Sequence, residues 1–411
     1  DRLVWDAVHD TVDLLAGPGE PVNLTVGQHS ITSAHVILDN LHESLECPAP
    51  GRLTVAPSAG AAGSAGEEEP LRTDIEWHEQ MSFVQRPVPV ATFSGQATAR
   101  RGEQSISGES LEVTFDLEME PVKIVAIANA VMEARSEHGE PAPAQNGAGG
   151  GSGEPEKEAA PPALLPATTG HWRLAADEIV VSPPRELVTS PTGGVLTMLE
   201  GDVTTATISW SKSVELALAD NEARFSGKVN ADLPGASLKS ETLRLESDEA
   251  GKLRHMWAED EVHFTRKGER AWELRSGSAE AVFGAGSQLQ QVIARDSVEV
   301  RDGTCTLVAQ LLQLFLVQVE GAEAPVVQRG IAQGEVRVDY EGAERLGAGG
   351  DRLEWNQDTD TYVLTGEPDA YVRRGGMTAR NDKILLDRTT GKVTFPPGPK
   401  PVKWTVAPEA R

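Results

Sequence analysis

Residues 93–116 read FSGQATARRGEQSISGESLEVTFD, and residues 225–248 read FSGKVNADLPGASLKSETLRLESD. The two segments align without a gap at an offset of 132 residues (225 − 93), and nine positions carry the same or a similar residue. A third copy begins at Leu364-Thr365-Gly366 and keeps the spacing to the apolar Met377 and to Asp387. A repeat of this length predicts a chain that is built from similar structural units.

Within these copies, apolar and polar residues alternate with a period of two, which is typical of half-buried β-strands. The clearest examples are residues 111–115, 298–300 and 336–338. The apolar run Leu307–Val319 has enough apolar residues for a buried helix, but its flanks are strand-like, and we expect a strand there. The sequence therefore predicts an all-β protein.

A second element, an apolar residue followed by any residue and then Trp, precedes each copy. It occurs at residues 75–77, 208–210 and 353–355. Residues 1–6 (DRLVWD) match residues 351–356 (DRLEWN) almost residue for residue, so we expect the chain to begin inside a repeat.

A third element contains a small or apolar residue, any residue, a turn-forming residue, any residue and Val. It occurs at residues 127–131, 199–203, 258–262, 294–298 and 332–336. Asn, Gly and Asp at its centre suit a sharp bend or a β-bulge, because a positive φ costs least for these residues. We expect the Val to start the next strand.

Two segments interrupt the repeats. Residues 56–70 and 138–170 are rich in Ala, Gly, Pro and Glu and cannot bury enough apolar surface to offset chain entropy. We interpret both as disordered surface insertions; composition alone also allows linkers between domains. Because both fall between repeat elements, we favour one continuous elongated β-structure, in which each unit covers the apolar face of its neighbour.

The repeats predict the following organisation. Residues 1–55 form a partial repeat, 56–70 a flexible insertion, 71–200 a repeat unit with a flexible insertion at 138–170, 201–340 a second unit, and 341–411 a C-terminal repeat.

Charge and cysteine content exclude several classes of protein. The 411 residues include 37 Lys and Arg against 63 Asp and Glu, a net charge of −26, which excludes a protein whose main task is to grip nucleic acid. No apolar stretch has the length of a membrane-spanning helix, and no signal peptide is present. Two cysteines, Cys47 and Cys305, exclude a disulfide scaffold, and the sequence leaves open whether they pair.

Candidate metal ligands and catalytic motifs are few. One dense group of metal-binding residue types occurs, and its spacing matches no zinc signature, so we expect no metal and no cofactor. Its members are His35, Asp39, His42, Glu43, Glu46 and Cys47. Asp116, Asp248 and Asp387 end predicted strands, where a turn cap is more common than a catalytic role. No catalytic motif is present, and we expect no enzyme activity.

The C-terminal third resembles the OstA-like (LptA-type) domain of the lipopolysaccharide-transport bridge. The family alternates four strand motifs, and residues 332–336 match Ala-x-Gly-x-Val, 353–355 match Leu-x-aromatic, 364–368 match Leu-x-Gly-x-Pro, and 384–387 match the closing apolar motif with its final Asp. The middle copies match more loosely, and the first 70 residues match only at their start and near Ile31–Asp39.

The resemblance implies an OstA-like β-jellyroll, which is a folded-over antiparallel sheet with an apolar groove. Acyl chains would lie in this groove, and units would join head to tail through open sheet edges across the periplasm. The implied partners are lipopolysaccharide or a similar lipid and other OstA-like, LptC-type or LptD-type proteins. This chain is longer than a single-domain bridge protein and carries two insertions.

The inward apolar positions of the repeats are the candidates for lining such a groove. They are Trp5, Trp77, Phe93, Leu111, Val113, Trp210, Phe225, Leu243, Leu245, Val336, Val338, Trp355 and Leu364. The repeated aromatic residues have a second interpretation, since they also suit a closed core between sheet layers.

Two other functions compete with lipid transport. A structural or adhesive extracellular β-solenoid rod with no cargo would show the same repeats, but side chains would fill its interior. A carbohydrate-active jelly roll would need a non-repeated cluster of polar residues in a cleft, and the sequence shows none.

Overall fold

The computed structural model divides the chain into two compact units. Unit 1 contains residues 1–149 and 166–223, and unit 2 contains residues 150–165 and 224–411. The described residues are 2–17, 20–56, 72–135, 171–200, 203–233, 235–248, 252–266, 271–284, 288–303, 305–318, 325–341, 345–356, 359, 361–374, 377–387, 392–396 and 401–406. Residues 57–70 and 138–170, where we predicted insertions, lie outside them, and the finer division into repeats remains a prediction.

Unit 1 consists of β-strands and one 3₁₀ helix in the ranges described. They are β1 (Arg2–Asp6), β2 (Thr11–Leu15), β3 (Val22–Val26), β4 (His29–Ser33), β5 (His35–Asp39), β6 (Ser44–Cys47), β7 (Gly51–Val55), β8 (Thr73–Trp77), β9 (Met81–Val84), β10 (Val90–Arg101), β11 (Gln104–Phe115), β12 (Pro121–Ala134), β13 (His171–Ser182), η2 (Pro183–Arg185), β14 (Leu187–Ser190), β15 (Gly194–Glu200), β16 (Val203–Trp210) and β17 (Ser213–Ala217). The boundary between the units falls within β18 (Glu222–Leu233).

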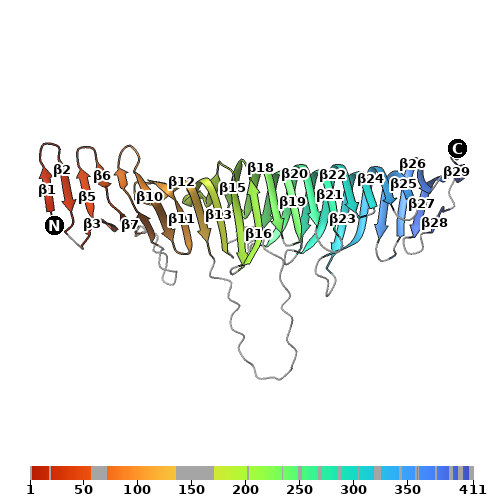
Figure 1. Ribbon diagram of the computed structural model, residues 1–411, viewed down its shortest axis with the longest axis horizontal. Coiled ribbons are helices and arrows are strands. Elements are labelled where there is room, and N and C mark those ends of the chain that lie inside the picture. Colours follow the sequence, from red (N-terminus) through yellow and green to blue (C-terminus); the bar gives the residue numbers. More distant parts are fainter. Residues whose placement is uncertain are drawn as a thin grey trace, which may run out of the picture. The chain divides into compact units, whose positions relative to one another are not determined.

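Unit 2 continues with strands of mostly 11–16 residues. They are β19 (Ala236–Ser247), β20 (Leu253–Arg266), β21 (Trp272–Phe283), β22 (Leu289–Asp302), β23 (Cys305–Val317), β24 (Val326–Glu341), β25 (Arg345–Asn356), β26 (Thr361–Arg374), β27 (Met377–Asp387), β28 (Val393–Thr394) and β29 (Lys403–Val406). From β19 to β27 each strand pairs antiparallel with the next along the chain (Figure 1). The predicted all-β antiparallel fold is confirmed, and the run that begins at Leu307 is strand β23.

The sheet of unit 1 separates into two ladders at β10. Residues 90–93 of β10 pair with β9, whereas residues 98–101 pair with β8. From β9 one ladder continues through β6, β5 and β2 to β1, and from β8 the other continues through β7 and β4 to β3. The two halves of a long strand thus belong to different ladders, which is the arrangement of a sheet folded over along its middle.

A line of β-bulges marks this fold in the long strands. The pairing register shifts in mid-strand between every two neighbours from β10 to β13 and from β19 to β27. Positive φ angles occur at these shifts, at Asn129, Asp260, Asp296 and Gly334. The bend predicted from the third sequence element is therefore confirmed, because a bulge with a positive φ re-aims the strand. In the copy at 199–203, Glu200 instead pairs with Val203.

The interior of unit 2 is one apolar cluster that includes residues from both sides of the bulges. Leu307 precedes the bulge of β23 and Leu312 follows it, and both belong to this cluster. Leu364 and Val372 have the same relation in β26. The two halves of each strand therefore face a shared interior, as expected for a folded-over sheet.

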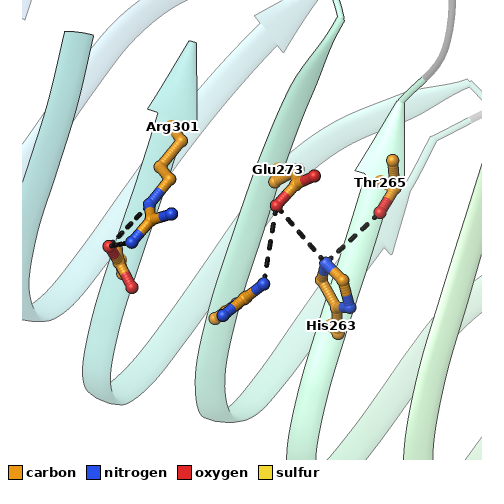
Figure 2. A network of polar contacts seen from close by, with 6 residues as sticks. His263, Thr265, Glu273 and Arg301 are labelled. Carbon is orange, nitrogen blue, oxygen red and sulfur yellow. Dashed lines mark hydrogen bonds and ion pairs between the residues drawn. The ribbon is translucent and has the colours of Figure 1, made fainter. Parts of the chain in front are cut away.

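The opposite face of unit 2 is polar. His263 of β20, Glu273 of β21 and Arg275 form a chain of ion pairs at 3.7 and 3.8 Å, and Arg301 of β22 lies near them with its own partner, Glu299 (Figure 2). Such exposed pairs contribute little to stability. They show instead which face is wet. Within the described ranges, no helical segment has the length and apolar character that crossing a bilayer requires.

Candidate functional site

The candidate groove residues lie almost entirely in the interior of the folded sheet. Ten of the thirteen are buried, namely Trp77, Phe93, Leu111, Val113, Trp210, Phe225, Leu243, Leu245, Val336 and Leu364. Val338 and Trp355 are half-buried and pack against the apolar cluster of unit 2. Alternation along each strand places them inward, because Arg244 and Arg337, their immediate neighbours in β19 and β24, are exposed.

Neighbouring strands bring these residues into direct contact. Phe93 of β10 stands opposite Leu111 of β11, and Leu111 stands opposite Ala126 of β12. The rings of Trp77 and Phe93 lie with centroids 5.5 Å apart. The interior is thus a continuous apolar surface within each unit, and the chain's own side chains cover most of it.

Three of the four predicted tryptophans have a glycine directly opposite in the neighbouring strand. The pairs are Gly51 and Trp77, Gly194 and Trp210, and Gly330 and Trp355. A Cβ atom built on Gly51 would lie 2.5 Å from Cζ2 of Trp77, and one on Gly194 would lie 2.7 Å from Cζ2 of Trp210. Each indole ring therefore lies flat across the glycine, in space that any other residue would occupy.

Two of these indoles are also fixed by a hydrogen bond. Nε1 of Trp77 donates to the carbonyl of Ala49 at 2.8 Å, and Nε1 of Trp210 donates to the carbonyl of Thr192 at 2.9 Å. In both cases the acceptor lies two residues before the paired glycine. The pair is a repeated structural device that the Trp motif alone did not reveal.

Trp5 differs from its three counterparts. It lies in β1, is 64% exposed, and has exposed apolar neighbours in Leu3 and Val4. In the part of the chain that the structure describes, β1 pairs only with β2. Trp5 is therefore part of an open sheet edge and does not line the interior.

One surface pocket of about 320 Å³ lies beside the bulges of β22, β23 and β24. Its lining includes Ser297, Glu299, Gln310, Glu335 and Arg337, and it is mainly polar. A lining of this kind does not suit an acyl chain. We do not assign the lipid site to this pocket.

The predicted turn role of the strand-ending aspartates is confirmed for two of them. Oδ1 of Asp116 accepts hydrogen bonds from the backbone N–H of Glu118 at 3.1 Å and of Glu120 at 2.8 Å. Oδ1 of Asp248 accepts one from the backbone N–H of Lys252 at 2.8 Å. Both carboxylates therefore hold tight turns between strands.

The dense group of metal-ligand residue types near Cys47 is not brought together. His42 instead hydrogen-bonds Oδ2 of Asp39 at 2.7 Å, and this bond lowers the pKa of Asp39. His35 pairs with Asp13 at 2.7 Å. Across the described residues, no three potential ligands gather around one point.

Both cysteines are free thiols, so the pairing that the sequence left open is not formed. Burial raises the pKa of Cys47 to about 12. At pH 8 only about one Cys47 thiol in ten thousand is then ionised, and the thiolate is the reactive form.

We expect Cys47 of a folded Cys305→Ser variant to resist iodoacetamide at pH 8 and to react fully in urea. Mass spectrometry after quenching measures the adduct. Wild-type protein in urea serves as the control, in which both thiols are counted. Stoichiometric labelling of the folded variant would show that Cys47 is not held in this buried environment.

Comparison with known families gives one match to a family model. Residues 282–392, from the end of β21 to the segment after β27, match the family described as LptA/(LptD N-terminal domain) LPS transport protein. This segment holds most of the apolar cluster of unit 2. No curated protein matches this chain.

Among solved structures, the chain is similar to the crystal structure of LptH, described as the LptA-homologous periplasmic component of the conserved lipopolysaccharide transport device from Pseudomonas aeruginosa. The alignment has 17% identity and a TM-score of 0.28, and it covers 34% of this chain and 97% of LptH. The OstA-like resemblance predicted from the strand motifs is thus confirmed by the family match, and the chain contains, at residues 282–392, a segment of the LptA/LptD N-terminal type found in lipopolysaccharide-transport proteins.

Proposed function

We propose that this chain is a periplasmic bridging protein for lipopolysaccharide or a similar lipid. Acyl chains lie between the two halves of the folded sheet, and sugars and phosphates stay outside. Other OstA-like, LptC-type or LptD-type proteins join it end to end through open sheet edges. The observation that carries the proposal is the apolar cluster within the family-matched segment, which includes residues from both sides of the bulges.

The chemistry of the two faces supports this role. An acyl chain needs an apolar lining without charges, and the cluster from Leu274 to Ile384 consists of apolar residues only. The outer bulge positions include the exposed acidic residues Asp260, Asp296 and Glu335. An acidic exterior disfavours non-specific adsorption to anionic lipid surfaces.

Acyl chains enter this interior by parting its two layers. The inward side chains are packed against one another, so the interior holds no standing channel of the width of a lipid tail. The layers must separate by about 4 Å, the contact distance of two carbon atoms. Because the two layers are joined only along the bulges, they can open at their free edges without loss of strand pairing.

Photo-crosslinking from paired interior and exterior positions tests the proposal. A photoreactive phenylalanine analogue replaces Leu111, Leu243 or Val338, and the control variants carry it at Glu112, Arg244 or Arg337. Each control is the next or preceding residue of the same strand and is exposed. We expect lipopolysaccharide to label the interior variants several-fold more strongly. Equal labelling of interior and exterior positions would reject lipid binding in the sheet interior.

A structural rod without cargo is the second candidate, and the closed packing of the interior favours it. A β-solenoid stacks parallel strands, whereas the ladders described here are antiparallel. The rod in question is therefore a folded antiparallel sheet. The same crosslinking experiment separates it from a lipid carrier.

A further inference from the structure

We propose that the open edge of β1 binds one antiparallel strand of a second protein, and that this strand carries a glycine opposite Trp5 and a Leu or Ala opposite Leu3. This inference rests on the proposed function, since it gives the chemistry of the partner at one end of the bridge. The partner is recognised by a Gly-x-Leu or Gly-x-Ala pattern in an exposed strand.

The first argument is that β1 and β2 reproduce part of β25 and β26 in the same register. Trp5 stands opposite Val12 and Leu3 opposite Leu14. At the corresponding positions of unit 2, Trp355 stands opposite Tyr362 and Leu353 opposite Leu364. The match of DRLVWD to DRLEWN therefore extends to the neighbouring strand and to its pairing.

The second argument is that β25 has a neighbour on its other side and β1 has none among the described residues. Residues 329–333 of β24 pair with residues 352–356 of β25. The equivalent edge of β1 exposes unpaired backbone groups and the side chains of Leu3, Val4 and Trp5. Such an edge is a template for a strand from another chain.

The third argument is that the missing neighbour has a constant chemistry in the three complete copies. Opposite the tryptophan there is always glycine, and two residues later, opposite the apolar residue of the motif, there is Leu or Ala. The three strands are Gly51-Arg52-Leu53, Gly194-Val195-Leu196 and Gly330-Ile331-Ala332. By the geometry of Trp77 and Trp210, the indole N–H of Trp5 then donates to the carbonyl two residues before the partner's glycine.

The same rule disfavours a second copy of this chain as the occupant. In β24, Gly330 pairs with Leu314 of β23. In β28, Val393 pairs with Leu386 of β27, which aligns with Leu314 in the repeat, so Val393 takes the place of that glycine. A valine opposite Trp5 would occupy the space that the indole needs.

Disulfide trapping with a synthetic strand tests the proposal. The protein carries Val4→Cys and Cys305→Ser, and the probe is the peptide VVQRGIAQ, the sequence of residues 326–333, with Cys in place of its Ile. In β24 this Ile, Ile331, stands opposite Glu354, the counterpart of Val4. We expect a mixed disulfide that forms about tenfold less with a peptide that has Val in place of Gly, a difference equal to tenfold weaker binding.

Three controls define the outcome. A peptide with its Cys moved to the Arg position should give little adduct if the register is fixed. In a Trp5→Ala protein the Gly and Val peptides should react equally, because the ring that requires glycine is absent. Equal trapping of both peptides by Trp5, or no dependence on register, would overturn the proposal, as would a dimer of the chain alone that Trp5→Ala dissolves.

The failure of this inference is distinguishable from failure of the lipid-carrier function. Photo-crosslinking from position 243 is scored on the same Val4→Cys protein. Lipid labelling without strand capture would reject only the partner strand. Strand capture without lipid labelling would reject only the cargo.

Discussion

Replacement of Trp77 by alanine is expected to lower the free energy of unfolding of unit 1 by about 4 kcal/mol, whereas Trp5→Ala is expected to change it by less than about 0.5 kcal/mol. Both residues occupy the Trp position of the same sequence element. Trp77 is 1% exposed and Trp5 is 64% exposed. The large loss arises because the cavity would be lined by Phe93 and Gly51, which are held by strand pairing and cannot collapse into it.

The alanine at position 77 also leaves the carbonyl of Ala49 without the indole donor. Urea unfolding followed by far-ultraviolet circular dichroism measures both variants, and an unchanged slope with denaturant shows that the comparison is valid. Equal losses for the two variants would contradict the distinction between a buried tryptophan and an edge tryptophan.

Replacement of Gly330 by valine is expected to lower the free energy of unfolding of unit 2 by about 3 kcal/mol, because the added side chain overlaps the indole of Trp355. Gly347→Val in β25 is the matched control. A Cβ there would meet only flexible side-chain atoms, Oδ1 of Asp339 at 3.3 Å and Arg373 at 3.5 Å. We expect the control to lose less than about 1 kcal/mol.

A double-mutant cycle shows whether the loss comes from the pair. In a Trp355→Leu background, Gly330→Val should cost at least about 1 kcal/mol less than in the wild type. Additive effects of the two substitutions would mean that the glycine is required by the backbone alone. Urea unfolding of all four proteins gives the coupling energy.

The fold was largely predictable because its signals are local. Period-two alternation in residues 111–115 and 336–338 was sufficient to predict strands β11 and β24. The turn-forming residues at Asn129, Asp260 and Asp296 were sufficient to predict bends, because a positive φ is cheap at Asn, Asp and Gly. These signals do not depend on distant parts of the chain.

The glycine partners of the tryptophans were not predictable, because their separation in sequence varies. Gly51 precedes Trp77 by 26 residues, Gly194 precedes Trp210 by 16, and Gly330 precedes Trp355 by 25. Only strand pairing brings each glycine opposite its ring. A pattern search at a fixed spacing therefore misses the pair.

The difference between Trp5 and its counterparts was also hidden from the sequence. The motif DRLVWD specifies what β1 offers, but burial depends on whether a neighbouring strand is present. Residue type likewise predicted an apolar interior at Leu111 and Leu243 without predicting how closely the two layers pack. Packing between layers depends on all side chains of the interior at once.

The central claim is that acyl chains lie between the two layers of the folded sheet, and the distance between the layers is the measurement that tests it most directly. Spin labels at Arg329 and Asp339, exposed outward positions on either side of the bulge of β24, report this distance by electron double resonance. We predict that lipopolysaccharide lengthens it by about 4 Å, the contact distance of two carbon atoms. An unchanged distance at saturating lipid would contradict the account.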